Sequence, residues 1–267
     1  VRRFYGVKRV GHAGTLDPMA CGVLPVLVGS AAAVQELVMD HDKVYKAGVL
    51  FGVTTDTGDV TGTTLETKEP SFDDASLKET LARFTGEIDQ VPPMYSALKV
   101  DGKKLYELAR QGIESIRVNE LNVQEHTVRM TVECSKGTYI RTLCHDIGKE
   151  LGVGGCMEHL VRSRVDRFKV EDSITLSQIE EFRDNGTLKE YIVPADEMLD
   201  MYSKCIVSES AEKLVYNGNI FTSGNTLLKM NHKEGQTVRV YTHDGKFIGL
   251  YMFIADKQIY KPIKMFL

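Results

Sequence analysis

The clearest hydrophobic pattern in the chain is a strict alternation of apolar and polar residues over positions 128–134. Successive side chains of a strand point to opposite faces, so this alternation predicts a half-buried strand. A helical spacing follows, with apolar residues three and four positions apart from Ile140 to Leu151. Gly152 marks the predicted end of that helix, because glycine commonly follows the last helical turn.

Weaker patterns predict four further elements in the first third of the chain. Helical spacing over residues 31–39 predicts a helix, and the apolar run 45–53 predicts a strand that leads into the polar turn 54–62. A second helix is predicted over residues 76–84, with an aspartate two or three residues earlier as its N-cap. Strands and helices therefore interleave along the chain.

The pattern of predicted elements changes after Pro194. A short helix is predicted near residues 210–216, and two strands, 237–241 and 247–254, are joined by an Asp-Gly turn. Short turns of this kind favour antiparallel hairpins over a purely parallel sheet, so the predicted class is α+β, with a small β-rich region at the C-terminal end.

The net charge of −4 argues against a protein that coats nucleic acid by bulk attraction. Two local basic clusters, residues 1–9 and 161–169, could bind a phosphate backbone, although a solvated basic face explains them equally well. No run approaches the roughly 20 apolar residues that a membrane helix needs. The opening residues also lack an apolar signal core, and we therefore expect a soluble, cytoplasmic protein without a membrane partner.

The five cysteines are odd in number, scattered and without a Cys-x-x-Cys pair, which predicts reduced and mostly buried thiols. Cys144 and His145 could combine with Cys156 and His159 as metal ligands. However, Cys144 lies on the apolar stripe of a predicted helix, and no other ligand pair has zinc-finger spacing. We therefore predict no metal site.

One acid is placed unusually, in the glycine-rich segment Gly11–Pro18. Asp17 precedes a proline, whose ring biases the preceding residue toward extended backbone. A turn in which Asp17 caps a backbone amide is the ordinary explanation. A phosphate-binding loop is excluded more directly, because the segment lacks the required Lys-Ser/Thr.

The segment GHAGTLDPMACGVLPVLVG resembles the sequence around the catalytic aspartate in the TruB family of pseudouridine synthases. Further segments follow in the family's order: DHDKVYKAGVLFG, TTDTGDVTG, FTGEIDQVPPMYSALKVDGKKLYELARQG, CSKGTYIRTLCHDIG and HLVRSRVDRF. They cover most of residues 6–180, and several ordered motifs are far more specific than one. The resemblance implies a catalytic domain over residues 1–193, with a mixed, mainly antiparallel sheet and flanking helices. It implies a PUA-like RNA-binding domain over residues 194–267.

The resemblance also implies a reaction and its residues. Asp17 would be the catalytic carboxylate that isomerises a uridine in the T loop of tRNA without metal or cofactor. Whether it acts as a nucleophile or as a base stays open. Arg141 would pair with Asp17 and orient it, and Tyr139 would lie against the target base. Without the family, Arg141 is the polar face of a helix and Tyr139 is a core residue.

Substrate contacts are implied in the same way. Tyr45 would stack on the flipped uracil, His12 would enter the T loop, and Leu160 would line the base pocket. Lys99 and Lys103 belong to a segment that would close over bound RNA. Without the family these are ordinary loop, strand, core and surface residues.

The remaining implications concern the RNA backbone and assembly. Arg162, in the second basic cluster, would contact substrate, and the C-terminal domain would hold the acceptor stem. We expect a monomer. The chain departs from the family pattern at its start, because the lysine-proline segment expected before Val1 is absent, and we therefore expect that an N-terminal segment is missing.

Two alternatives to a stand-alone enzyme are compatible with the scaffold. A guide-dependent synthase of the dyskerin type shares the catalytic core, but such proteins usually add basic tails and partner surfaces, whereas the net charge of −4 and a compact C-terminal domain favour the stand-alone enzyme. A non-catalytic RNA-binding or RNA-folding module would use the same scaffold without needing Asp17.

Overall fold

The computed structural model describes residues 1–35, 39, 41–91, 109–122, 125–228 and 231–267, and the chain forms two compact units. One unit contains residues 14–25 and 39–173, and the other contains residues 1–13, 26–38 and 174–267. We call them the catalytic-fold unit and the C-terminal unit. None of the described helices combines the length and apolar character needed to cross a membrane.

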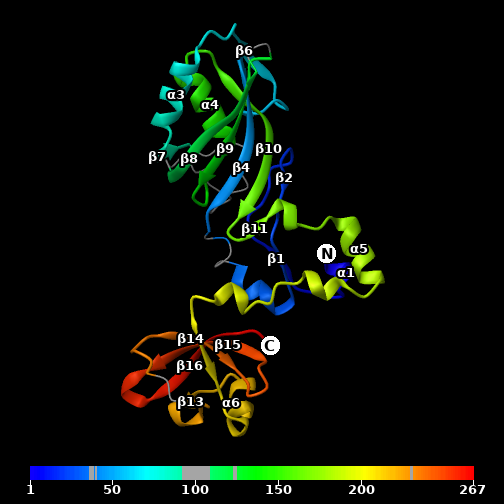
Figure 1. The fold of residues 1–267 in the computed structure, drawn as a ribbon, viewed down its shortest axis with the longest axis vertical. Helices are drawn as coiled ribbons and strands as arrows, with labels where there is room; N and C mark the ends of the chain where they lie inside the picture. Colours follow the sequence, from blue (N-terminus) through cyan, green and yellow to red (C-terminus); the bar gives the residue numbers. More distant parts are fainter. Residues whose placement is uncertain (36–38, 40, 92–108, 123–124, 229–230) are drawn as a thin grey trace. The chain divides into compact units, whose positions relative to one another are not determined.

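A seven-stranded, mostly antiparallel sheet forms the catalytic-fold unit (Figure 1). Its strands follow the spatial order β11-β10-β4-β9-β8-β7, and β2 joins β10 in parallel. The strand bounds are β2 Cys21–Gly22, β4 Lys43–Phe51, β7 Gly86–Gln90, β8 Ala109–Asn122, β9 Thr127–Cys134, β10 Gly155–Val165 and β11 Phe168–Lys169. A separate hairpin pairs β5 Val53–Thr55 with β6 Thr64–Thr67.

Two helices pack on this sheet, α3 (Asp74–Arg83) and α4 (Ile140–Glu150). Asp73 caps α3 in a capping box with Ser76, which explains why the helix begins before residue 76, where the sequence analysis placed its start. The apolar stripe of α4 and the alternate apolar residues of β9 are buried in one hydrophobic core, in agreement with the spacing of each element. A short 3-10 helix, η2 (Val170–Asp172), follows β11.

A five-stranded sheet dominates the C-terminal unit, with the order β12-β14-β15-β16-β13. Its strands are β12 Ser203–Ile206, β13 Phe221–Thr222, β14 Thr237–Tyr241, β15 Phe247–Ile254 and β16 Ile259–Met265. The Asp-Gly turn joins β14 to β15 as predicted, and Gly245 in it has a φ of +87°. The predicted β-rich C-terminal region is therefore confirmed.

The rest of the C-terminal unit consists of a two-stranded sheet and short helices. The sheet pairs β1 Val10–His12 with β3 Val26–Val28. The helices are α1 Arg2–Tyr5, η1 Gly29–Val34, α5 Leu176–Asp184, η3 Leu188–Tyr191, η4 Glu197–Leu199, η5 Glu209–Ala211, α6 Glu212–Tyr216, η6 Ser223–Asn225 and η7 Ala255–Lys257. The helix predicted over residues 31–39 begins as the 3-10 helix η1, and residues 36–38 lie outside the described part of the chain.

Candidate active site

The segment that carries Asp17 lies against the edge of the seven-stranded sheet. Gly22 pairs in parallel with Arg162 of β10, and the Val23 amide donates to the Arg162 carbonyl at 2.9 Å. The Ala20 amide donates to the backbone carbonyl of Asp17 at 2.9 Å, which closes the turn after the acid. The carboxylate of Asp17 is 39% exposed and therefore accessible to a ligand.

Arg141 provides the cation beside this carboxylate. It is the second residue of α4, and its side chain is only 7% exposed, although the sequence alone placed it on the polar face of a helix. Its Nε lies 2.8 Å from Oδ2 of Asp17. The N–H of Nε is not aligned for a hydrogen bond among the described residues, so this contact is an ion pair. The structure thus brings together the two residues that the resemblance paired.

Asp59 is a second carboxylate beside Arg141, and the sequence analysis missed it. Nη1 of Arg141 lies 3.5 Å from Oδ2 of Asp59 and 3.4 Å from the Thr57 carbonyl. Asp59 lies in the polar turn after β5, between Thr57 and Thr61. Acids and threonines are common in turns, so the sequence did not single this residue out. That flanking pair was the available signal, since hydroxyl donors around an acid indicate an ordered carboxylate.

Hydrogen bonds keep the buried Asp59 ionised. Burial raises its pKa, but the hydroxyl and amide of Thr61, the Thr57 hydroxyl and the Arg141 charge together lower the pKa below its ordinary value. The Thr61 amide and the Thr57 hydroxyl each donate to Oδ1 at 3.0 Å. Arg141 therefore lies between a buried anion, Asp59, and an accessible one, Asp17.

The aromatic and apolar residues predicted at the site come from neighbouring strands. Tyr45 on β4 is in register with Arg162 on β10, and Leu160 lies on the same strand as Arg162. Tyr45 and Leu160 are both buried in the core of the catalytic-fold unit. Burial is also the main cause that raises the pKa of the Tyr45 hydroxyl.

Tyr139 is the N-cap residue of α4 and is half-buried. Its backbone amide donates to Oε1 of Gln90 at 2.9 Å, and its carbonyl accepts from Nε2 of the same residue at 3.1 Å. Gln90 is buried at the end of β7. These two hydrogen bonds from the Gln90 side chain fix the start of the helix that carries Arg141.

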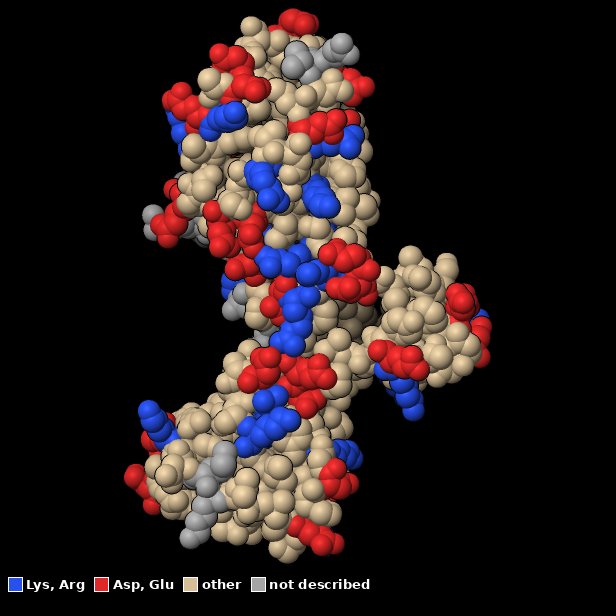
Figure 2. All heavy atoms as spheres, in the orientation of Figure 1, with Lys and Arg blue, Asp and Glu red and all other residues tan. Residues whose placement is uncertain are grey.

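The other predicted contact residues belong to different parts of the chain. His12 is exposed on β1, in the C-terminal unit, and Lys99 and Lys103 lie outside the described residues. Arg162 is only 1% exposed, which does not suit the exposed phosphate contact that the basic cluster suggested. Its side chain instead donates to backbone carbonyls of the Asp17 segment. Figure 2 shows basic and acidic side chains interspersed on the face in view.

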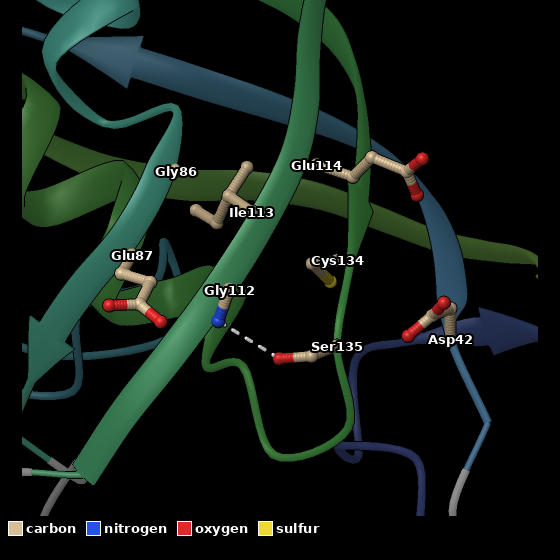
Figure 3. Close-up of a pocket in the computed structure, with 8 residues that line it drawn as sticks. All are labelled: Asp42, Gly86, Glu87, Gly112, Ile113, Glu114, Cys134 and Ser135. Atoms are coloured by element: carbon tan, nitrogen blue, oxygen red, sulfur yellow. Dashed lines mark hydrogen bonds between the residues drawn. The ribbon is translucent and has the colours of Figure 1, made fainter.

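A hollow of about 270 Å³ lies elsewhere in the catalytic-fold unit, and Asp17 is not among its lining residues (Figure 3). Three acids contribute to its lining: Asp42, Glu87 and Glu114. Such a lining repels phosphates, so this hollow does not suit RNA. The Asp17–Arg141 pair is the better candidate for chemistry because it joins an accessible carboxylate to a buried cation.

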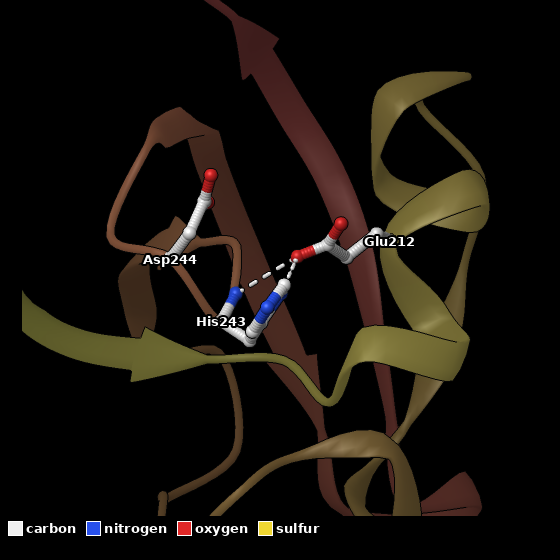
Figure 4. Close-up of side chains that lie close together, drawn as sticks. All are labelled: Glu212, His243 and Asp244. Carbon is white, nitrogen blue, oxygen red and sulfur yellow. Dashed lines mark hydrogen bonds and ion pairs between the residues drawn. The ribbon is translucent and has the colours of Figure 1, made fainter.

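A cluster of side chains of the metal-binding kind lies in the C-terminal unit and includes none of the cysteines. Glu212, His243 and Asp244 place their ligand atoms within 4.8 Å of one another (Figure 4). Glu212 already forms a hydrogen-bonded ion pair with the His243 ring. Cys144 and Cys156 are buried free thiols, and all five cysteines are free with four of them buried, as predicted.

Solved structures share this fold. The chain superimposes with a TM-score of 0.71 on a protein in a structure titled "Crystal Structure of a Cbf5-Nop10-Gar1 Complex", at 25% identity, over 100% of this chain and 79% of that one. A structure titled "Structure of H/ACA RNP bound to a substrate RNA containing 2'-deoxyuridine" gives a TM-score of 0.70 at 24% identity, over 100% of this chain and 78% of that one. Residues 2–140 also match a family model of pseudouridylate synthases, and this match, together with the shared fold, makes the chain a pseudouridine synthase.

Family models and relatives identify the family of pseudouridine synthases to which the chain belongs. The model described as TruB family pseudouridylate synthase (N terminal domain) matches residues 2–140, and that of the tRNA pseudouridylate synthase B C-terminal domain matches residues 141–200. The chain belongs to the TruB family. Proteins named tRNA pseudouridine synthase B are 43% identical in Lachnoclostridium phytofermentans, over 97% of this chain and 91% of that protein, and 37% identical in Bacillus subtilis, over 99% and 91%.

Proposed function

We propose that this protein converts a uridine in the T loop of tRNA into pseudouridine, as a stand-alone isomerase that uses Asp17. The observation that carries the proposal is the ion pair between the accessible Asp17 and the buried Arg141, 2.8 Å apart. The relatives that carry the name tRNA pseudouridine synthase B support the choice of substrate.

The chemistry follows from the isomerisation itself. The bond between N1 of uracil and C1′ of ribose breaks, the base turns, C5 bonds to C1′, the proton on C5 is lost and N1 takes up a proton, so that the product is an isomer of the substrate. An ionised carboxylate can attack an electron-poor carbon or take a proton, so Asp17 suits either role. Arg141 holds the carboxylate in one orientation, and Asp59 balances the arginine's second side. A buried guanidinium with one anion would otherwise carry an uncompensated donor.

The remaining site residues are assigned by the same proposal. Tyr45 and Tyr139 support the flipped base, and Leu160 lines its pocket. His12 holds the T loop open, and Lys99 and Lys103 contact the RNA backbone. Because Tyr45 and Leu160 are buried in this structure, entry of a base requires the surrounding loops to move.

The proposal extends to domains and setting. Residues 1–193 form the catalytic domain, and residues 194–267 form a PUA-like domain that holds the acceptor stem. The five-stranded sheet at residues 203–265 supports the second assignment. We further propose that the enzyme acts as a monomer on tRNA in the cytoplasm.

A non-catalytic RNA-folding module is the alternative, and one experiment separates the two. Tritium release from 5-tritiated uridine in a T-loop minihelix would be measured for the unmodified protein, for Asp17→Asn and for Asp74→Asn. Asp74 is an exposed acid in the first turn of α3 and serves as the matched control.

We expect release from the unmodified protein and from Asp74→Asn, and none from Asp17→Asn. Tight binding of the minihelix without release from any of the three proteins would favour the RNA-folding module. The guide-dependent alternative predicts release only after guide RNA and partner proteins are added.

A further inference from the structure

Arg162 is a buried charged residue that the proposed reaction does not use directly. Its side chain, on β10, is 1% exposed and is among the largest fully buried side chains described. Nε donates to the Val23 carbonyl at 2.9 Å, and Nη2 donates to the Gly14 carbonyl at 2.9 Å. These two carbonyls stand at the two ends of residues 14–23, the segment that carries Asp17.

The backbone around Arg162 holds the same segment. Gly22 pairs with Arg162, and a Cβ atom on Gly22 would lie 2.2 Å from the Arg162 carbonyl oxygen. At the other end, a Cβ atom on Gly14 would lie 3.2 Å from Nη1, and Gly14 has a φ of +86°. Both glycines therefore allow the segment to approach the arginine more closely than other residues would.

The donor geometry explains why this position holds an arginine. A guanidinium presents several N–H donors in a fixed plane, so one side chain reaches two carbonyls in different directions. Burying a cation is costly unless its donors are satisfied, and here backbone oxygens satisfy two of them. The nearby Lys43 is also buried, and its pKa is lowered, first by burial and then by the Arg162 charge.

We propose that Arg162 is a positioning residue for the catalytic carboxylate. It fixes both ends of residues 14–23 to β10, and this sets the place of Asp17 relative to Arg141, which comes from a different element, α4. The inference rests on the proposed role of Asp17. Position matters because a displacement of about 1 Å from productive geometry costs on the order of 100-fold in rate.

The test uses Arg162→Lys in the full chain, with Arg129→Lys as the matched control. Arg129 is an exposed arginine on β9 that pairs with Glu120. A lysine at position 162 keeps the charge but cannot hold both carbonyls. We expect the single-turnover rate of tritium release at saturating enzyme to fall at least about tenfold, corresponding to one lost hydrogen bond from a charged group. The Kd for the minihelix should stay within about twofold, since the side chain is buried.

The proposal would be overturned if Arg162 contacted an RNA phosphate. Such a contact predicts a change in Kd without a change in rate, which is the opposite of the result expected above. The Kd would rise and its dependence on salt would become shallower, while the rate at saturation would be retained. Unchanged rate and unchanged Kd would also overturn it. If the lysine variant does not fold, Arg162→Gln, whose amide reaches one carbonyl at most, is compared with Arg129→Gln by the same criteria.

A second measurement does not depend on activity. Amide hydrogen exchange within residues 14–23 should become at least about tenfold faster in Arg162→Lys, and should be unchanged in Arg129→Lys. If the unmodified protein releases no tritium but exchange is faster in Arg162→Lys, the proposed function is rejected, whereas the proposal that Arg162 holds residues 14–23 is retained. Unchanged exchange would reject that hold.

Discussion

Arg141 and Asp59 are buried together, with Nη1 of the arginine 3.5 Å from Oδ2 of the aspartate and both side chains only 7% exposed. A different nitrogen of the same guanidinium, Nε, lies 2.8 Å from Oδ2 of Asp17. Asp59 is therefore the buried partner of the Arg141 cation, and Asp17 is its accessible partner.

Arg141→Lys should lower kcat on the order of 100-fold, the range seen when one charge-stabilising donor is removed from an active site. A lysine carries a single compact charge and cannot pair with two carboxylates on different sides. Arg83→Lys is a matched control, because Arg83 also pairs with two acids, Glu79 and Glu150, but on an exposed surface. Steady-state tritium release measures both, and equal losses in the two variants would contradict a special role for Arg141.

Asp59→Asn should lower kcat by about 10- to 100-fold, because a hydrogen bond to a charged group contributes about 1.5–3 kcal/mol. The asparagine keeps the shape of the side chain but removes the anion that holds Arg141. Asp56→Asn, an exposed acid in the same turn that accepts from the Thr63 amide, should leave kcat within about twofold. A change in KM alone for Asp59→Asn would assign this residue to substrate binding instead.

The lowered pKa of Asp59 predicts a pH-dependent contribution to stability. The folded pKa lies below the ordinary value of 3.8, so the contribution is fully present above that value and is lost as the pH falls through the folded pKa. Urea unfolding of the unmodified protein and of Asp59→Asn should therefore differ most near pH 6. The difference in unfolding free energy should shrink at pH 3, and a difference that grew on acidification would contradict this sign.

Thiol labelling should modify about one cysteine in five at neutral pH. Cys21 is exposed, whereas the other four cysteines are buried. Burial raises the pKa of Cys134 and Cys156 to about 11 and that of Cys205 to about 12, and it raises the pKa of Cys144 further. A thiol-specific chromophore should react once, and Cys21→Ser should abolish the fast phase, because the thiolate is the reactive form. Several fast thiols in the native protein would contradict the burial.

His243 should titrate above its ordinary pKa of 6.5, because its hydrogen bond with Glu212 favours the protonated ring. Stability from this pair is thus fully present below pH 6.5 and is lost as the pH rises through the raised pKa. NMR titration of the ring should show the pKa falling toward 6.5 in Glu212→Gln. Glu209→Gln, which removes a charge that acts only at longer range, should have a smaller effect.

Local patterns predicted some of the regular elements of this protein, but not strand β8, strand β16 or helix α5. Strand β9, helix α4 and the β14–β15 hairpin each follow from the spacing of apolar residues and from glycine at turns, which are properties of adjacent positions. Strand β10 was missed. Its alternation is broken because a charged residue, Arg162, points inward where an apolar residue would be expected.

The candidate site was likewise predicted in part from the sequence and decided in part by the tertiary structure. Neighbouring positions in the sequence determined β9, α4 and the β14–β15 hairpin, and the ordered motifs identified Asp17 and Arg141 as partners. Only the tertiary structure decided which charges are buried, because burial of a charge depends on partners distant in the chain. Arg141 meets Asp59 across 82 positions and Arg162 meets Gly14 across 148. Local patterns cannot register such pairs, since desolvation is compensated only when the fold brings the donors and acceptors together.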